Sequence, residues 1–211
     1  MTFKQKLTGD HPPQLGLWQA LANNYTADIC ARAGFDWLLF DGEHSPNTAQ
    51  TLLGQLQAVA PAPVEPIARV PSGDPVLIKQ YLDIGFTTLL VPMVDTAEQA
   101  KAAADACHLP PLGNRSWGFG RARTLGADYA ANVNDEVLCM VQIESATAVE
   151  NAEAILATPG VHGCWAGPAD LALSMGIHPN HTAEDDRHRR ALERIVQACH
   201  NTGTAPGIAC G

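Results

Sequence analysis

Short apolar runs alternate with longer segments of helical periodicity along most of the chain, and this alternation constrains the fold more than any other feature. Seven runs are apolar at nearly every residue, as in strands that helices cover on both faces. They span residues 14–18, 36–41, 64–70, 87–94, 137–144, 161–167 and 205–210. Because no change of composition divides the chain, residues 1–211 are expected to form a single domain.

The segments between the runs carry helix signals. Asp74 is a candidate N-cap, Pro75 follows it in the first turn, and Gly85 comes just past the expected end of this helix. The segment 183–203 has the same form and closes on Gly203. A strand–helix repeat of this kind predicts an α/β architecture, either an open doubly wound sheet or a (β/α)8 barrel.

The charge balance argues against several classes of partner. With a net charge of −9, the chain has no electrostatic reason to bind nucleic acid or an anionic membrane. No run approaches the roughly 20 apolar residues of a membrane helix. The N-terminal stretch MTFKQKLTGDHPP lacks the apolar core of a signal peptide. A cytoplasmic protein is therefore expected, and its six scattered cysteines are expected to be reduced.

Polar residues gather at the carboxyl ends of the apolar runs, where both architectures place their active sites. They are Trp18, Asp41, Glu43, His44, Arg69, Gln142, Glu144 and Asp170. Each has an ordinary alternative; Asp170, for example, could simply cap a helix. Because several different runs contribute to one rim, the pattern as a whole favours an active site.

Two of these carboxylates suggest a metal site. Glu144 and Asp170 follow two successive runs, and oxygen ligands of this kind suit Mg²⁺ or Mn²⁺. A cation with two protein ligands keeps positions open for a bidentate 2-oxo acid, whose keto group it would polarise. None of the lysines ends an apolar run, so carbonyl chemistry through a Schiff base is not expected.

The segments GLWQALANNYTADICARAGFDWLLFDGEHSPN, LLVPMV, VQIES and GPADLALSMG resemble the class II pyruvate aldolases of the 4-hydroxy-2-oxoheptanedioate aldolase (HpcH/HpaI) family. The similarity runs from about residue 14 to the chain end. It implies a (β/α)8 barrel that binds Mg²⁺, Mn²⁺ or Co²⁺ and cleaves 4-hydroxy-2-oxo acids to pyruvate and an aldehyde. It also implies a homo-oligomer, either a hexamer or a trimer of dimers.

The resemblance assigns roles residue by residue. Glu144 and Asp170 resemble the metal ligands, Arg69 the residue that stabilises the pyruvate enolate, and His44 with its partner Asp83 the pair that positions the base. Substrate contacts are implied for Gln142 and for the turn of Gly167, Pro168 and Ala169, with Asp41 and Glu43 as outer groups near the metal's water. From their positions in the sequence, Trp18 and Arg115 are also expected to contact the substrate. Arg115, Arg121 and Arg123 lie on a long loop, 113–123, which is expected to reach over the rim and select the aldehyde.

The strand count departs from the resemblance. The seven runs predict a (β/α)8 TIM barrel that lacks its eighth βα unit at the C-terminus and is open between the first and seventh strands. Two other functions stay open. One is a carbon–carbon lyase of the citrate lyase β-subunit or malyl-CoA type, which would need a coenzyme A site. The other is a non-catalytic fragment, inactive because its barrel is open.

Overall fold

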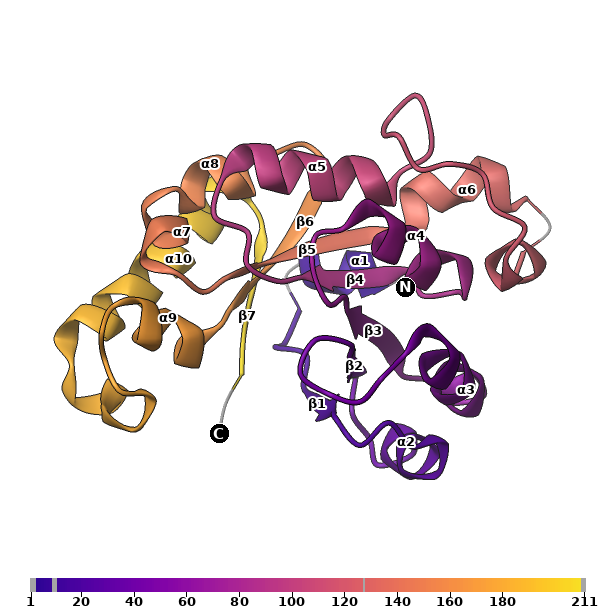
Figure 1. The fold of residues 1–211 in the computed structure, drawn as a ribbon, viewed down its shortest axis with the longest axis horizontal. Coiled ribbons are helices and arrows are strands. Elements are labelled where there is room, and N and C mark those ends of the chain that lie inside the picture. Colours follow the sequence, from indigo (N-terminus) through magenta and orange to yellow (C-terminus); the bar gives the residue numbers. More distant parts are fainter. Residues whose placement is uncertain (1–2, 9–10, 127, 210–211) are drawn as a thin grey trace.

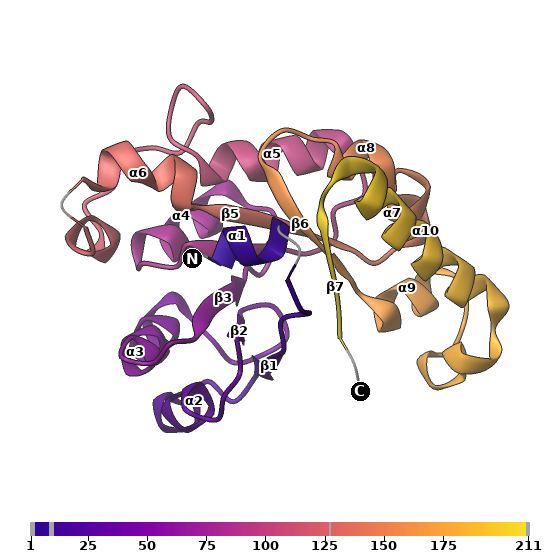
Figure 2. The same cartoon turned by 180° about the vertical axis from the view of Figure 1, so that it is seen from behind.

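The computed structural model describes residues 3–8, 11–126 and 128–209. Seven parallel strands form one sheet in sequence order: β1 (Gly16–Gln19), β2 (Trp37–Asp41), β3 (Glu65–Arg69), β4 (Thr88–Val91), β5 (Leu138–Ile143), β6 (Val161–Ala166) and β7 (Ala205–Ile208). β1 and β7 are the two edges of the sheet, which curves into an open half-barrel (Figures 1 and 2). The seven predicted strands and the open side between the first and the last are confirmed.

Helices connect the strands and cover the outer face of the sheet (Figure 1). They are α2 (Asn24–Ala31), α3 (Ala49–Val59), α4 (Pro75–Asp83), α5 (Ala97–Cys107), α6 (Tyr129–Glu136), α7 (Ala146–Glu150), α8 (Ala152–Leu156), α9 (Pro168–Ser174) and α10 (Asp186–Thr202). Two 3-10 helices, η1 (Arg121–Thr124) and η2 (Pro179–Glu184), precede α6 and α10, and α1 (Phe3–Thr8) precedes β1.

Local signals explain where the outer helices begin and end. Asp74 caps α4 by accepting the amides of Val76 at 2.7 Å and Leu77 at 3.2 Å. Gly85 then leaves the helix with a φ of +110°, a conformation that residues with a Cβ rarely adopt. Gly203 ends α10 in the same way. These are the residues at which the sequence predicted the boundaries.

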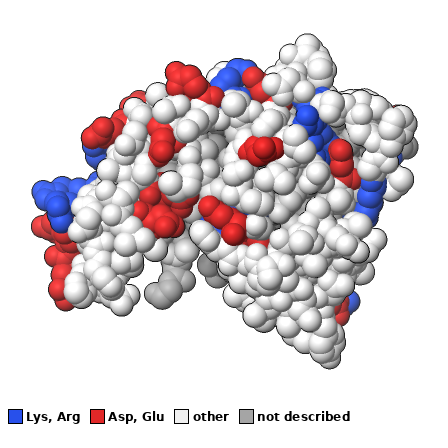
Figure 3. Space-filling model, in the orientation of Figure 1, with Lys and Arg blue, Asp and Glu red and all other residues white. Residues whose placement is uncertain are grey.

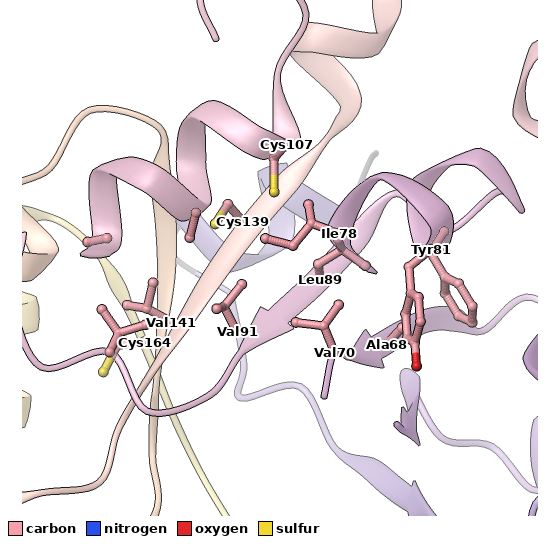
Figure 4. Close-up of a cluster of buried hydrophobic side chains, with 14 of the residues drawn as sticks. Ala68, Val70, Ile78, Tyr81, Leu89, Val91, Cys107, Cys139, Val141 and Cys164 are labelled. Atoms are coloured by element: carbon pink, nitrogen blue, oxygen red, sulfur yellow. The ribbon is translucent and has the colours of Figure 1, made fainter. Parts of the chain in front are cut away.

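The main core lies between the sheet and the helices outside it. In Figure 4, Ile78 of α4 and Cys107 of α5 lie over Leu89, Val91 and Cys139 of the strands, and all five side chains are buried. The five cysteines that the structure describes are free thiols, as predicted. Cys210 lies outside the described residues.

A second, smaller core fills the inside of the half-barrel. It consists of inward-facing side chains from successive strands, namely Leu39, Ile67, Leu90, Met140 and Trp165, with Trp18 and Trp37 against them. Phe3 and Leu7 of α1 pack against the same cluster, so this helix closes the end of the barrel where the strands begin. The sequence did not predict α1, because six residues carry too little periodicity to mark a helix.

The surface agrees with the acidic composition. Acidic side chains are scattered over the face shown in Figure 3, and basic ones lie mostly at its margins. Within the described residues, no helix is both long and apolar enough to cross a membrane.

Candidate active site

The opposite end of the barrel, where the strands finish, carries a network built around Arg69. Asp41 and Arg69 are the last residues of β2 and β3 and are paired in the sheet register. The Arg69 guanidinium binds the Asp41 carboxylate through two bonds, Nε–Oδ1 at 2.9 Å and Nη2–Oδ2 at 2.7 Å. Its Nη1 lies 3.0 Å from Oε2 of Glu43. Both partners of this two-bond pair are almost fully buried, which fixes the plane of the guanidinium.

Trp18 completes this support from the edge strand. Its indole Nε1 donates to Oδ2 of Asp41 at 3.2 Å, and its ring lies 4.7 Å from the guanidinium carbon of Arg69. A cation over an indole ring gains electrostatic stabilisation. Arg69 is thus held by two carboxylates and one aromatic face.

The two acids next to Arg69 have pKa shifts in opposite directions. Burial opposes ionisation of Asp41, but hydrogen bonds from Arg69, the Glu43 amide and Trp18 outweigh it, so the pKa of Asp41 is lowered. Burial dominates at Glu43 and raises its pKa, with Arg69 opposing the shift. The ionised form of Asp41 is therefore stabilised, whereas the ionised form of Glu43 is destabilised.

The loop after β2 turns sharply around Asp41. Oδ1 of Asp41 accepts the amides of Glu43 at 2.9 Å and His44 at 3.3 Å. Ser45 donates its hydroxyl to the Asp41 carbonyl, and Asn47 donates its amide to the same carbonyl at 2.8 Å. This turn leaves the His44 side chain 67% exposed, with Nε2 3.9 Å from Oε2 of Glu43.

Glu144 follows β5 and is a buried acid at the same rim. Its Oε1 accepts the amide of Met93 at 2.8 Å, and its Oε2 accepts the side-chain amide of Gln142. Met93 has a φ of +54°, in the left-handed region. This conformation costs a non-glycine residue about 1 kcal/mol, and it accompanies the hydrogen bond from the Met93 amide to Glu144. The other amide atom of Gln142, Oε1, is buried and has no hydrogen-bond partner among the residues that the structure describes.

The pKa of Glu144 is raised to about 7, first because the carboxyl is buried and then because Asp170 and Glu43 place like charges near it. The Met93 amide and Arg69 oppose this shift. Asp170 lies in the first turn of α9, directly beyond β6. No group of three or more His, Cys, Asp or Glu side chains in the described part of the chain is arranged to hold a metal ion.

The turn between β6 and α9 is in close contact with these groups. A Cβ at Gly167 would lie 2.5 Å from Oε2 of Glu144 and 2.9 Å from Nε2 of Gln142. Only glycine fits this position without displacing Glu144. Pro168 and Ala169 continue the turn, and Ala169 is exposed at the rim.

Two of the predicted residues, Asp83 and Arg115, lie elsewhere. Asp83 is the last residue of α4, a helix that runs from the carboxyl end of β3 back to the start of β4. Its Oδ1 binds Nη2 of Arg115 at 2.7 Å, and that same nitrogen donates to the Tyr129 hydroxyl at 2.8 Å. Arg115 is only 2% exposed.

The loop 113–123 therefore packs against the end of α4, and a Cβ on Gly118 or Gly120 would strike Asp83. It lies at the end of the barrel where the strands begin, not over the rim of its own chain as expected. The reason is topological: the loop follows the outer helix α5, and in a parallel sheet an outer helix returns the chain to the amino ends of the strands.

Comparison with known proteins identifies the family to which this arrangement belongs. The HpcH/HpaI aldolase/citrate lyase family matches residues 14–207. The chain belongs to this family. By this family and by its aldolase relatives, the chain is a class II pyruvate aldolase, a carbon–carbon lyase, and the family is metal-dependent.

Individual HpcH/HpaI relatives are similar over nearly the whole chain. A hydroxypyruvate/pyruvate aldolase of Deinococcus radiodurans is 50% identical, with 98% of this chain and 75% of the relative covered. A 4-hydroxy-2-oxo-heptane-1,7-dioate aldolase of Salmonella arizonae is 46% identical, with 98% and 79% covered. The crystal structure of a family protein from Burkholderia cenocepacia J2315 superposes with a TM-score of 0.92 at 38% identity, covering 99% of this chain and 84% of that one.

Sequence reasoning missed three contributors to the HpcH/HpaI site. Ser45 and Asn47 fix the loop after β2, and the Met93 amide binds Glu144. Ser45 and Asn47 sit beside the predicted Asp41–His44 segment, so small hydrogen-bonding residues before a helix were a usable signal. Met93 gave no signal, because its contribution comes from backbone conformation.

Proposed function

We propose that this pyruvate-dependent aldolase cleaves 4-hydroxy-2-oxo acids to pyruvate and an aldehyde, with Glu144 and Asp170 as the ligands of a divalent cation. The observation that carries the proposal is the excess of acceptor oxygens around Glu144. A buried carboxyl with a pKa raised to about 7, two further acids acting on it and an unpartnered Gln142 oxygen form a site that a hard cation would stabilise.

The cation would supply Lewis acidity toward the 2-oxo group of the substrate. Arg69 supplies the second positive charge. Three of its five N–H donors bind Asp41 and Glu43, which leaves two to face a developing enolate oxygen without reorganisation. Gln142 and the turn of Gly167, Pro168 and Ala169 would bind the pyruvate portion, with Trp18 beside Arg69.

The base-positioning pair of His44 and Asp83 needs a second copy of the chain. His44 follows the carboxyl end of β2, whereas Asp83 ends α4 beside the amino end of β4. The two lie at opposite ends of one barrel, and each pairs with another residue, His44 with Glu43 and Asp83 with Arg115. This separation supports a homo-oligomer in which Asp83 of one copy reaches His44 of another.

The proposal is tested by pyruvate release from a 4-hydroxy-2-oxo acid, measured after metal removal and again with Mg²⁺, Mn²⁺ or Co²⁺ added back. Glu144→Gln and Asp170→Asn should each lose activity at least about 100-fold, since even the outer partners of metal ligands typically contribute 10- to 100-fold. Glu150→Gln, at an exposed position on α7, is the matched control.

Full turnover by the stripped enzyme, or by either ligand variant, would overturn the proposal. A panel of aldehydes in the reverse reaction would define the acceptor. Coenzyme A thioesters belong in the same panel, because cleavage of a thioester but not of a free 2-oxo acid would favour the citrate lyase type of reaction.

A further inference from the structure

Helix α9 carries Asp170 but has little stability of its own. It spans seven residues, whereas isolated helices shorter than about 12 residues are marginal in water. Gly167 stands at its N-cap position, and no side chain accepts the free amides there. The orientation of Asp170 must therefore come from the contacts that hold α9 in place.

Those contacts come from several directions. The Gly167 amide donates to the carbonyl of Ile143, which ties the turn to the end of β5 at 3.1 Å. At the other end of the helix, Oγ of Ser174 accepts the Ala146 amide at 2.9 Å. Leu171, one residue past Asp170, is fully buried in the main core. A fourth contact holds the first turn of α9, where Asp170 lies.

His188 makes this fourth contact. It lies in the first turn of α10, is 4% exposed, and has Nε2 2.8 Å from the carbonyl oxygen of Pro168. A carbonyl oxygen only accepts, so Nε2 carries the hydrogen and donates it. Pro168 is the first residue of α9, two positions before Asp170. His188 thus bonds the end of α9 that carries the carboxylate.

We propose that His188 is a positioning residue for the active site: its bond to Pro168 holds the first turn of α9 so that Asp170 and Glu144 keep the spacing that binds the cation. The inference rests on the proposed function of these two acids. Movement of this turn would displace both acids. Asp170 is part of α9, and Gly167 lies close to the Glu144 carboxylate. His188 itself touches neither the substrate nor the cation.

Three substitutions separate the hydrogen bond from the bulk of the ring. A glutamine side chain places its amide nitrogen near the position of Nε2, whereas an asparagine carries the same group but ends short of it. His188→Gln should keep the bond to Pro168, and His188→Asn and His188→Ala should lose it. His200→Ala is the matched control, because His200 is exposed on the same helix.

The first readout is the binding of Mn²⁺ alone to metal-stripped protein, by calorimetry. The Kd should rise about tenfold for His188→Ala and His188→Asn, in the range found for outer partners of metal ligands, and stay within about threefold of wild type for His188→Gln. At saturating Mn²⁺, kcat of the two weakened variants should return to within about threefold of wild type, because every group that touches the substrate is intact.

The outcomes are distinguishable. Wild-type Mn²⁺ affinity in His188→Asn, or equal affinities in His188→Gln and His188→Asn, would overturn the inference, and this pair decides it even where His188→Ala does not fold. A low kcat with an unchanged Kd would also overturn it. Failure of the wild-type protein to bind Mn²⁺ and release pyruvate would instead overturn the proposed function.

Discussion

At the scale of single residues, two buried acids at the rim have opposite pKa shifts because their partners differ. Asp41 and Glu144 are both buried at strand ends, yet the pKa of Asp41 is lowered and that of Glu144 is raised. The difference lies in the partners: Asp41 receives two bonds from Arg69, whereas Glu144 receives only neutral donors and lies near other acids. Asp41 therefore serves to fix Arg69, and Glu144 is left able to compensate a cation.

Arg69→Lys tests whether the shape of the cation matters as well as its charge. Lysine has a compact ammonium and no planar fork, so it would lose the two-bond geometry with Asp41 and its aim at the enolate. We expect kcat to fall about 100-fold or more, the effect typical of one lost preorganised donor, with Mn²⁺ binding within about threefold of wild type. Arg189→Lys, at an exposed ion pair, is the control. A kcat within twofold of wild type would remove Arg69 from the mechanism.

Burial of His162 is expected to make the stability of the fold sensitive to acid. Burial lowers its pKa to about 4, with Lys4 and His108 acting in the same direction, and its Nδ1 accepts the Cys139 amide at 3.3 Å. The pKa in the folded state lies below the unfolded value of about 6.5, so protonation favours unfolding. The stability that the neutral ring contributes is present above pH 6.5 and is lost as the pH falls through about 4.

His162→Asn keeps an acceptor for the Cys139 amide but has nothing to protonate. We expect its free energy of unfolding to fall less between pH 6.5 and pH 4 than that of the wild type, by at most about 3 kcal/mol and by less where water screens the ring. Urea unfolding at a series of pH values measures this difference. Parallel pH profiles for the two proteins would contradict it.

At the scale of secondary-structure elements, Asn47 connects the loop between β2 and α3 to the helix that follows it. Asn47 donates to the Asp41 carbonyl at 2.8 Å, and its Oδ1 accepts from Gln55 at 2.7 Å and from Thr51 at 3.0 Å. Gln55 is 1% exposed, so this bond satisfies a buried amide. The loop that carries Glu43 and His44 is thereby fastened to the helix that follows it.

Asn47→Ala should therefore loosen the rim and weaken the fold together. Removing a partner of a buried polar group costs about 1–3 kcal/mol, and we expect the free energy of unfolding to drop by this amount. Activity should fall as well, because Glu43 contacts Arg69. Asn180→Ala, in η2, is a control for the loss of an asparagine side chain outside this network. Unchanged stability in urea unfolding would show that the network does not hold the loop.

The same elements show what the sequence could predict. All seven strands were predictable because each lies in a short, mostly apolar run that alternates with helical segments. The Asp41–Arg69 pair was not, since its members are 28 residues apart and meet only through sheet register. The place of loop 113–123 depends on which end of the barrel the preceding helix α5 reaches. Local sequence patterns do not contain this information. Loop 113–123, with Arg115, lies away from the rim of its own chain, whereas the role of Asp83 beside His44 stays a prediction.

At the scale of the whole molecule, the two ends of the half-barrel have different contents. The rim holds the acids, Arg69 and His44, whereas Asp83 and the exposed aromatic residues Trp117 and Phe119 lie with loop 113–123 at the other end. An association that brings the second end of one copy to the rim of another would complete the His44–Asp83 pair. This arrangement predicts that two variants, each impaired in one member of the pair, regain activity when their chains are mixed in one oligomer.

The prediction is complementation between two weakened variants. His44→Ala and Asp83→Asn should each be impaired, but in mixed oligomers some sites combine an intact His44 with an intact Asp83 from another copy. Random mixing would make about one quarter of sites complete, and activity should recover to that extent. Mixing His44→Ala with Glu144→Gln is the control, because these residues serve the same rim. Equal recovery in both mixtures, or in neither, would contradict the arrangement.

The three tryptophans inside the half-barrel also have an optical consequence. The Trp165 ring contacts both Trp18 and Trp37, with centroid distances of 5.6 Å and 5.4 Å, and Trp18 also contacts Asp41 and Arg69. The fourth tryptophan, Trp117, lies on the outer loop. In a Trp117→Phe protein, all indole fluorescence would arise from this one cluster beneath the rim. The chain therefore contains its own emission probe, able to follow occupancy of the site in a stopped-flow experiment without any attached dye.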